Sequence, residues 1–191
     1  TAIRLFIVPL AKLKMEFLQQ YHDEHGVPVR SQLVGNFSRL SALASIAPWG
    51  YNLIYKTPSL RKFANKLIGF HPDRTMPLLH STTLRKWFDK RKVTGSGSKG
   101  TLYLFCDEFT NYNDVEIGQK AIMILEKLGY KVLMINHDVS GRPQLSKGML
   151  KEAKIIAEKN VTIFKDLITS KTPLVGIEPS AILTFRDEYP D

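Results

Sequence analysis

Three segments in the second half of the chain end in polar side chains, each at the point where an apolar stretch gives way to a turn. The turns begin at Cys106, His137 and Glu178, so they offer a thiol, an imidazole and a carboxylate. Such groups bind metals, transfer protons or orient anions when they are brought together. In an open parallel sheet, the turns that follow the strands lie at one edge. We therefore expect one polar crevice there, formed by residues far apart in the sequence.

The second turn, residues 137–143, carries the main candidates for anion binding. Gly141 permits a close backbone approach, and Arg142 presents a planar fork of N–H donors that matches a carboxylate or a phosphate. Ser140 adds a hydroxyl beside them. The alternative is structural: Gly141 and Pro143 shape the turn, and Arg142 pairs with a local acid such as Glu178. Both explanations stay open at this point.

The third turn places the carboxylate of Glu178 at a strand end, followed by Pro179 and Ser180. Proline suits a first helical turn and serine caps exposed amides, so a helix start explains these two residues. Ser180 remains a candidate for contacting a bound anion. Glu178 is either the ion-pair partner of Arg142 or a group of the site.

The imidazole of His137 and the thiol of Cys106 can each be interpreted either as a structural group or as part of a site. His137 can donate or accept a hydrogen bond or bind a metal, but a lone histidine in a polar turn is more often solvated. Cys106 ends an apolar strand, where a free thiol usually behaves as a small hydrophobic side chain rather than as a reactive or ligating group. As the only cysteine, it excludes a disulfide within the chain and any metal site built from cysteines alone.

The elements that must position these turns alternate between strand and helix. We expect strands at 102–105, 131–135 and 174–177, and helices at 115–128, 149–159, 161–168 and 180–185. Right-handed crossovers between parallel strands would bring the three turns to the same sheet edge. The pattern predicts a small α/β fold, a doubly wound, Rossmann-like parallel sheet of about three strands.

The first half of the chain follows a different pattern. Residues 11–92 show helical spacing of apolar side chains, interrupted at short intervals by Gly and Pro. This predicts several short helices, with Ser59 and Ser81 as N-caps, in an extended arm that wraps another body. The glycine- and serine-rich stretch 94–100 marks the junction. We therefore divide the chain into a basic helical arm, 1–96, and an α/β domain, 97–191.

The positive charge is concentrated in the arm. The whole chain has a net charge of +9, yet residues 1–96 hold fifteen Lys or Arg against five Asp or Glu, and residues 97–191 hold twelve against thirteen. A solvated helical face or a docking surface for an acidic neighbouring domain explains this excess. Membrane headgroups, through a peripheral association, and nucleic acid are the alternatives. Nucleic acid is the least favoured, because no recognised nucleic-acid-binding motif accompanies the charge.

We expect no export signal at the start of the chain. Residues 1–10 are apolar, but they are too short to span a bilayer and show no small-residue cleavage pattern. We expect the chain to be a piece of a longer polypeptide. A single cysteine fits a reducing compartment, so we expect a cytoplasmic location.

Several motifs resemble a known family. The segments 109–112, 140–148 and 178–190 resemble the C-terminal cysteine-rich domain of FAD-linked, iron-sulfur 2-hydroxyacid oxidoreductases, of the glycolate oxidase-like or D-2-hydroxyglutarate dehydrogenase-like forms. Residues 12–21 are similar to the stretch that follows the last ferredoxin-type cysteine motif in those proteins. The resemblance covers about residues 11–191.

The cysteines of that family are missing here. Where the family has Cys-Cys before Gly141, this chain has Val139 and Ser140, and where the family has Glu-Pro-Ser-Cys it has Ala181. Glu108 takes the remaining cysteine position, and Cys106 lies two residues before it. Iron-sulfur clusters need thiolates. We therefore expect no cluster, no metal and no other cofactor within this chain.

The resemblance implies a role inside a larger protein. FAD and four-iron four-sulfur clusters would be bound by upstream flavin and ferredoxin-like domains or subunits. A small 2-hydroxy acid and an electron acceptor would be the other partners. The crevice with Gly141, Arg142, Glu178 and Ser180 would serve as an accessory substrate or electron-acceptor pocket, with Glu178 or His137 to handle protons. The alternative is a cluster-free interaction module that docks a flavin domain or a partner protein.

Overall fold

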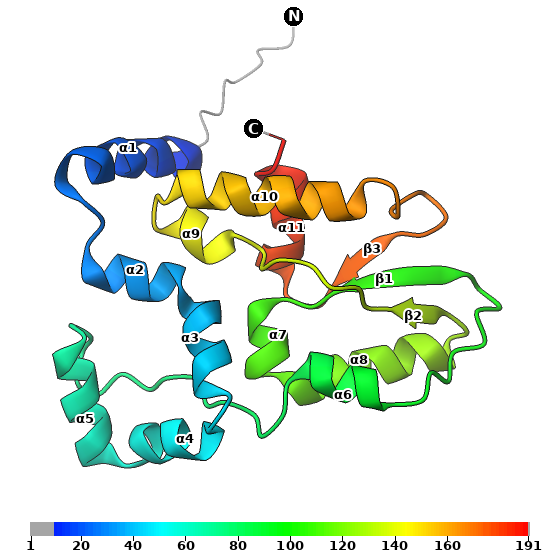
Figure 1. The fold of residues 1–191 in the computed structure, drawn as a ribbon, viewed down its shortest axis with the longest axis horizontal. Helices are drawn as coiled ribbons and strands as arrows, with labels where there is room; N and C mark the ends of the chain where they lie inside the picture. Colours follow the sequence, from blue (N-terminus) through cyan, green and yellow to red (C-terminus); the bar gives the residue numbers. More distant parts are fainter. Residues whose placement is uncertain (1–9, 191) are drawn as a thin grey trace, which may run out of the picture.

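The computed structural model describes residues 10–190, and its centre is a three-stranded parallel sheet. The strands β1 (Thr101–Phe105), β2 (Lys131–Leu133) and β3 (Leu174–Gly176) lie in the order β2-β1-β3, as Figure 1 shows. Thr101 is paired with Lys131, and Tyr103 with Leu174. The prediction of an α/β fold with three parallel strands, preceded by helices, is confirmed.

Helices cover both faces of the sheet (Figure 1). α8 (Val115–Lys127) lies on one face, and α10 (Leu150–Phe164) and α11 (Pro179–Asp187) lie on the other. The short helices α7 (Glu108–Tyr112) and α9 (Arg142–Ser146) lie beyond the ends of the strands. Gly129, with φ +98°, closes the turn after α8, as expected. The prediction of two separate helices at 149–159 and 161–168 is wrong, because residues 150–164 form one continuous helix. No Gly or Pro separates the two segments, so nothing breaks the backbone hydrogen bonding there.

The hydrophobic core has two parts because successive strand residues point to opposite faces. Leu104 of β1 packs below the sheet with Ile122 of α8 and Val132 of β2. Phe105 packs on the other face with Phe164 of α10 and Ala181 of α11. β1 is thus buried on both faces, which suits the central strand of a parallel sheet.

The helix that precedes β1, α6 (Leu84–Lys90), packs into the core below the sheet. Leu84 is fully buried there, and Thr83 rather than the expected Ser81 caps the helix, because its Oγ1 accepts a hydrogen bond from the Lys86 N–H at 3.2 Å. Arg91 and Thr94 then pair with Glu126 of α8. The core therefore extends to residues on both sides of the glycine-rich stretch.

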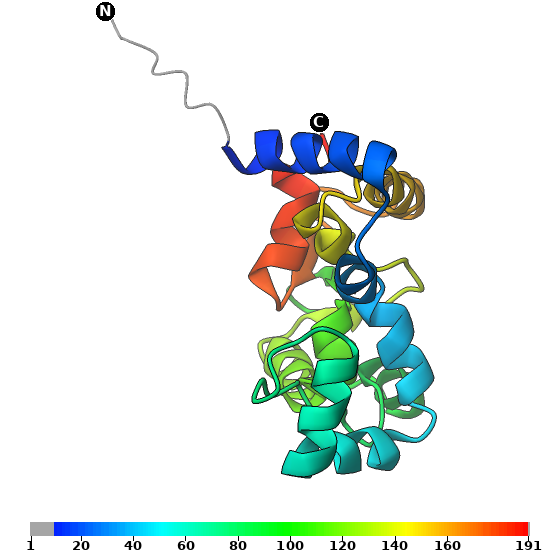
Figure 2. The ribbon, with the colours of Figure 1, turned by 90° about the vertical axis from the view of Figure 1, so that its left-hand side faces the viewer.

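The remaining helices of the arm run along the carboxyl edge of the sheet. Figure 1 shows them at the left, and Figure 2 shows them facing the viewer. They are α1 (Leu10–His25), α2 (Val29–Gly35), α3 (Phe37–Ala44), α4 (Pro48–Lys56) and α5 (Pro58–Leu67). Pro58 starts α5, so Thr57 takes the N-cap position that was predicted for Ser59. Residues 1–9, most of the apolar start, lie outside the described residues.

Contacts from α1, α2 and α3 are among those that join the arm to the α/β unit of its own chain. His22 Nε2 of α1 lies 2.9 Å from the carbonyl oxygen of Lys147. Gln144 of α9 donates from Nε2 to the Gly35 carbonyl at 2.7 Å. Phe37 of α3 stacks on Phe109 of α7, with 5.0 Å between ring centroids. These contacts hold the arm across the ends of the strands.

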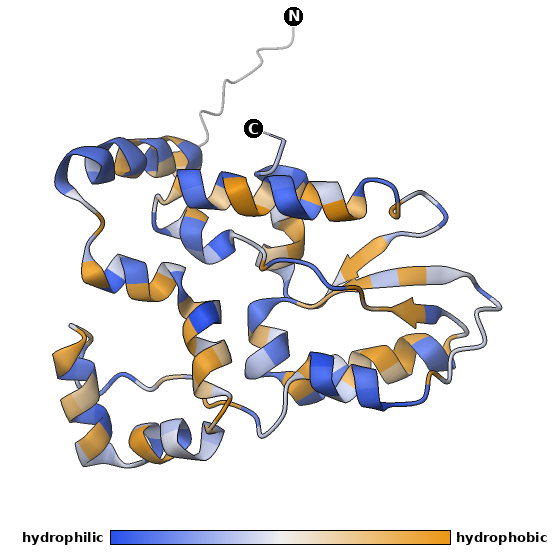
Figure 3. Cartoon of the chain, viewed as in Figure 1, coloured by the Kyte–Doolittle hydropathy of each residue, from blue (hydrophilic) through white to orange (hydrophobic). Residues whose placement is uncertain are grey.

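Exposed large apolar side chains are frequent in residues 37–67, and the ribbon of α3 to α5 has orange segments in Figure 3. The most exposed of them are Leu43, Ile46, Trp49, Leu53, Phe63 and Leu67, and Ile46 is 81% exposed. Exposed apolar side chains in such number on neighbouring helices are typical of interaction sites. Among residues 10–190, no helix combines the length and the apolar character needed to cross a membrane.

Gly118 tests the contact between α8 and α6. A Cβ at position 118 would lie 2.4 Å from Leu84 Cδ2 and 2.8 Å from Thr110 Cγ2. We expect Gly118→Ala to lower the free energy of unfolding by about 1–3 kcal/mol in urea denaturation, because overpacking outweighs the gain in helix propensity. Gly50→Ala in α4 is the control, since a Cβ there meets nothing within 4 Å. Equal effects of the two substitutions would contradict the packing described here.

Candidate functional site

The turns after β1 and β2 meet at the carboxyl edge through a buried contact between Glu108 and Ser140. Glu108 Oε1 accepts a hydrogen bond from Ser140 Oγ at 2.7 Å, and Oε2 accepts from the Ser140 N–H at 3.2 Å. The exposed fraction is 3% for Glu108 and 0% for Ser140. Burial raises the pKa of the Glu108 carboxyl above its usual range. Two residues that the resemblance sets at cysteine positions thus bind each other.

The second turn is also held by α10 and by the end of α11. Asn160 donates from Nδ2 to the Val139 carbonyl at 2.8 Å and to Tyr189 Oη at 3.0 Å. Tyr189 in turn donates to the Ser140 carbonyl at 3.0 Å. Burial raises the pKa of Tyr189 to about 12, so it remains a neutral donor. Neither residue was predicted from the sequence, although a polar Asn160 in step with the buried Ala153 was a usable signal.

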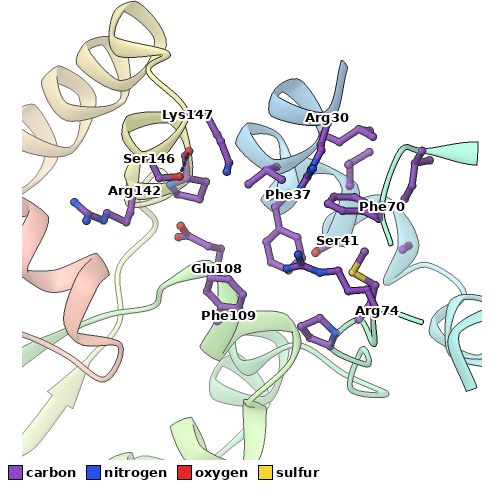
Figure 4. A pocket seen from close by; sticks show the side chains of 18 of the residues that line it. Arg30, Phe37, Ser41, Phe70, Arg74, Glu108, Phe109, Arg142, Ser146 and Lys147 are labelled. Atoms are coloured by element: carbon purple, nitrogen blue, oxygen red, sulfur yellow. Dashed lines mark hydrogen bonds between the residues drawn. The ribbon is translucent and has the colours of Figure 1, made fainter. Parts of the chain in front are cut away.

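Arg142 pairs with an acid, as the structural alternative predicted, but its partner is Glu188 and not Glu178. Its Nη1 donates to Glu188 Oε1 at 2.5 Å, in an ion pair at the end of α11. Figure 4 shows the guanidinium pointing away from the cavity and the side-chain stem at its edge. Gly141 has φ +72° and is the N-cap of α9, which is the tight turn expected of it. One guanidinium nitrogen is engaged, and further N–H donors remain.

Glu178 caps α11, a role that was predicted for Ser180. Its Oε2 accepts from the Ala181 N–H at 2.5 Å and from Ser180 Oγ at 2.7 Å. Ala181 itself packs with Phe105 in the core above the sheet. The third turn therefore contributes a capping carboxylate and a hydroxyl to the edge of the cavity.

His137 is half-buried and its ring packs against Phe105, so it is less solvated than expected. Its Nε2 accepts from the Cys106 N–H at 3.0 Å, so Nδ1 carries the proton and donates to the Asp138 carbonyl at 2.6 Å. The ring stacks on Phe105 with 4.2 Å between centroids. Burial lowers the pKa of His137 to about 4. A neutral imidazole with both nitrogens bonded to backbone holds the first two turns together and has no free nitrogen for a metal.

Cys106 and Asp107 complete the first turn. Cys106 is buried in the core below the sheet, and burial raises the pKa of its thiol to about 12. Asp107 caps α7 by accepting from the Phe109 and Thr110 N–H groups at 3.0 and 2.9 Å. Burial raises its pKa as well. Cys106 therefore behaves as a small hydrophobic side chain.

These residues do not fit an iron-sulfur cluster. The one thiol is buried in its protonated form, and Glu108 and Ser140 use their oxygens on each other. Among residues 10–190, no three or more His, Cys, Asp or Glu side chains are grouped so as to hold a metal ion. The donor set at this edge is made of hydroxyl and carboxyl oxygens, whereas such clusters need thiolates.

A cavity of about 690 Å³ opens between the three turns and the arm. Figure 4 shows Glu108, Arg142 and Lys147 on one side and Arg30, Phe70 and Arg74 on the other. Much of its wall comes from apolar side chains of the arm. The sequence predicted a crevice built from the turns alone, without the arm, because no local pattern shows which helices cross the strand ends.

Comparison with known proteins places these features in a wider context. No protein-family model matches the chain, and no solved structure does. The chain is 25% identical to the D-2-hydroxyglutarate dehydrogenase of Escherichia coli (strain K12), over 95% of this chain and 19% of that protein. The corresponding protein of Pantoea ananatis (strain AJ13355) is 26% identical over the same shares.

A further relative has a different substrate in its name. It is one of the subunits of the anaerobic glycerol-3-phosphate dehydrogenase of Escherichia coli (strain K12), and it is 26% identical over 69% of this chain and 34% of that protein. The chain thus spans about a fifth of the length of the D-2-hydroxyglutarate dehydrogenases that it matches. These relatives support the resemblance to oxidoreductases that was noted in the sequence.

Proposed function

We propose that this chain is the C-terminal part of a flavin-dependent, iron-sulfur oxidoreductase that acts on a 2-hydroxy acid of the glycolate, lactate or 2-hydroxyglutarate type. The observation that carries the proposal is similarity along 95% of the chain to several proteins named D-2-hydroxyglutarate dehydrogenase. FAD and the four-iron four-sulfur clusters would be held upstream, by flavin and ferredoxin-like domains or subunits. The whole protein would work in the cytoplasm.

Within that protein, the chain forms an accessory domain for the substrate or the electron acceptor. The guanidinium of Arg142 supports this role, because it lies at the sheet edge beside the strand-end turns and points away from the cavity (Figure 4). Arg142 keeps guanidinium N–H donors beyond the one engaged by Glu188, and these can bind a substrate carboxylate. Glu178 caps a helix and both ring nitrogens of the neutral His137 are bonded to backbone groups, so neither is assigned a proton-transfer role. The chain alone does not turn over substrate.

The test uses the full-length protein and an artificial electron acceptor. We expect oxidation of at least one of D-2-hydroxyglutarate, lactate and glycolate, and Arg142→Met should raise the KM for that acid about tenfold by removing a charge-assisted hydrogen bond. Arg186→Met is the matched control, because Arg186 is exposed and pairs with Asp187, its neighbour in the chain. If none of the three acids is oxidised, the proposed function is wrong.

The second candidate is an interaction module that docks the flavin domain or a partner protein. The exposed apolar side chains of α3 to α5 and the basic excess of residues 1–96 favour it. In that case Arg142→Met leaves the KM unchanged. Trp49→Asp, on the exposed surface of α4, then weakens association with the upstream domains.

A further inference from the structure

Two arginines from separate parts of the arm share one aromatic ring. Arg30 of α2 and Arg74, in the loop after α5, place their Cζ atoms 5.1 and 5.3 Å from the Phe70 ring centroid. The two charges are therefore at most about 10 Å apart, which is about one Debye length at 0.1 M salt. Within residues 10–190, neither guanidinium has a carboxylate partner. Like charges held together in this way favour a bound anion.

The loop that carries Arg74 is fixed by a buried amide. Asn65 of α5 is 0% exposed, and its Nδ2 donates to the carbonyl oxygens of His71, Pro72 and Arg74 at 3.2, 3.1 and 2.8 Å. The backbone of the loop at Arg74 is thus fixed before any ligand arrives, and only the Arg74 side chain has to be ordered on binding. A preformed loop of this kind lowers the entropic cost of binding.

Lys147 brings a third cation to the cavity from α9's C-terminal end. Its carbonyl oxygen is engaged by His22 of α1, which fixes the backbone there. Figure 4 shows its amino group directed into the gap between α9 and α2. No carboxylate pairs with Lys147 in the described part of the chain. The three cations therefore approach one cavity from two sides.

The rest of the wall suits an apolar molecule. Val34, Phe37, Ile68 and Met76 line the cavity together with Tyr51. Burial raises the pKa of Tyr51 to about 12, and its hydroxyl donates to the Pro77 carbonyl at 3.2 Å, so this side chain presents its ring rather than a charge. A volume of about 690 Å³ lies in the range of ligand sites in proteins.

We propose that this cavity binds an elongated anion, whose carboxylate or phosphate head contacts Arg30 and Arg74, with the charge of Lys147 on the opposite side of the cavity, and whose apolar body lies against the wall around Phe37. A small 2-hydroxy acid is too short and too polar to cover that wall. The ligand is therefore a molecule other than the substrate of the proposed function. Binding at this site depends only on side chains of this chain and does not require that function.

Isothermal titration of the 191-residue chain tests the charge and the apolar body separately. The probes are decanoate, decyl phosphate, decyltrimethylammonium and inorganic phosphate, each below its micellar concentration. We expect one decanoate or decyl phosphate per chain, bound at least about tenfold more tightly than the cationic probe or phosphate alone. The stronger of the two anions tells a carboxylate from a phosphate head. Equal affinity for the anionic and cationic probes, or no binding of either anion, overturns the proposal.

Variants then place the ligand in the cavity. Arg74→Gln should weaken the tighter anion about tenfold. Ala44→Phe, which fills the cavity from α3, should abolish binding while leaving the far-ultraviolet circular dichroism unchanged. Lys154→Gln, on the exposed side of α10, is the charge-matched control and should bind like the unaltered chain. Equal loss in the Arg74 and Lys154 variants means that the charge acts non-specifically, and the proposal fails.

Discussion

Replacing Glu126 with Ala is expected to lower the free energy of unfolding by about 3–5 kcal/mol, which is the cost of leaving a buried charge without its partner. Arg91 donates from Nη1 and Nη2 to the two oxygens of Glu126, both at 2.8 Å. The side chains are only 10% and 2% exposed. Thr94 donates to the same carboxylate at 2.7 Å. The substitution would leave the guanidinium of Arg91 without a carboxylate partner, next to the Phe88 ring, whose centroid lies 4.3 Å from Arg91 Cζ.

Urea denaturation of two further variants shows whether the loss of stability in Glu126→Ala comes from an unpaired buried charge. Asp73→Ala breaks the pair with Lys62, whose members are 55% and 61% exposed, and should leave the free energy of unfolding almost unchanged. The double variant Arg91→Met/Glu126→Leu should recover most of the loss, because it removes both charges and keeps the volume. A double variant as unstable as Glu126→Ala would show that packing, rather than an unpaired charge, causes the effect.

The ion pair between Arg91 and Glu126 also makes the free energy of unfolding depend on pH. Burial opposes ionisation of Glu126, but the hydrogen bonds from Arg91 and Thr94 outweigh it and hold the pKa below its usual 4.5. A carboxyl with a lowered folded-state pKa adds stability above pH 4.5, and this contribution is lost as the pH falls through the folded value. The difference in stability between the unaltered chain and Glu126→Gln should therefore shrink on acidification below about pH 4.5.

Local patterns in the sequence were enough to predict the sheet. The apolar stretches became β1, β2 and β3, and Gly129 and Gly141 took the left-handed conformations that their turns required. Hydrophobic periodicity and turn chemistry act over a few residues, so they can be recognised without knowing the fold. For the same reason the break expected inside α10 was wrong, since no local signal supported it.

Pairings over long distances in the chain were harder to predict. Arg142 has its carboxylate partner 46 residues away, at Glu188, although Glu178 looked equally suitable from the sequence. Asn160 reaches the second turn from a helix, and the arm supplies much of the cavity wall. Which of several chemically equivalent partners is chosen depends on how helices pack, and packing is a property of the whole fold.

The second large effect concerns the buried contact between Glu108 and Ser140, at two positions where the resemblance predicts cysteines. Glu108→Ala is expected to lower the free energy of unfolding by about 3 kcal/mol, because it leaves the N–H and hydroxyl of Ser140 without their acceptor in a fully buried place. Glu108→Gln is the matched control. Its amide oxygen can accept from the Ser140 N–H and its amide nitrogen can donate to Ser140 Oγ, so most of the stability should remain. Glu116→Ala, on the exposed face of α8, controls for the loss of a glutamate.

The pH dependence of this contact has the opposite sign to that of Glu126. Burial raises the pKa of Glu108 above its usual 4.5, and the nearby Asp107 adds to the rise. A carboxyl that holds its proton more tightly in the folded state contributes most below pH 4.5, and this contribution declines as the pH rises toward the folded value. Stability measured from pH 4.5 upward should therefore fall less steeply in Glu108→Gln than in the unaltered chain. Identical slopes would mean that the pKa of Glu108 does not change on folding and that water reaches its contact with Ser140.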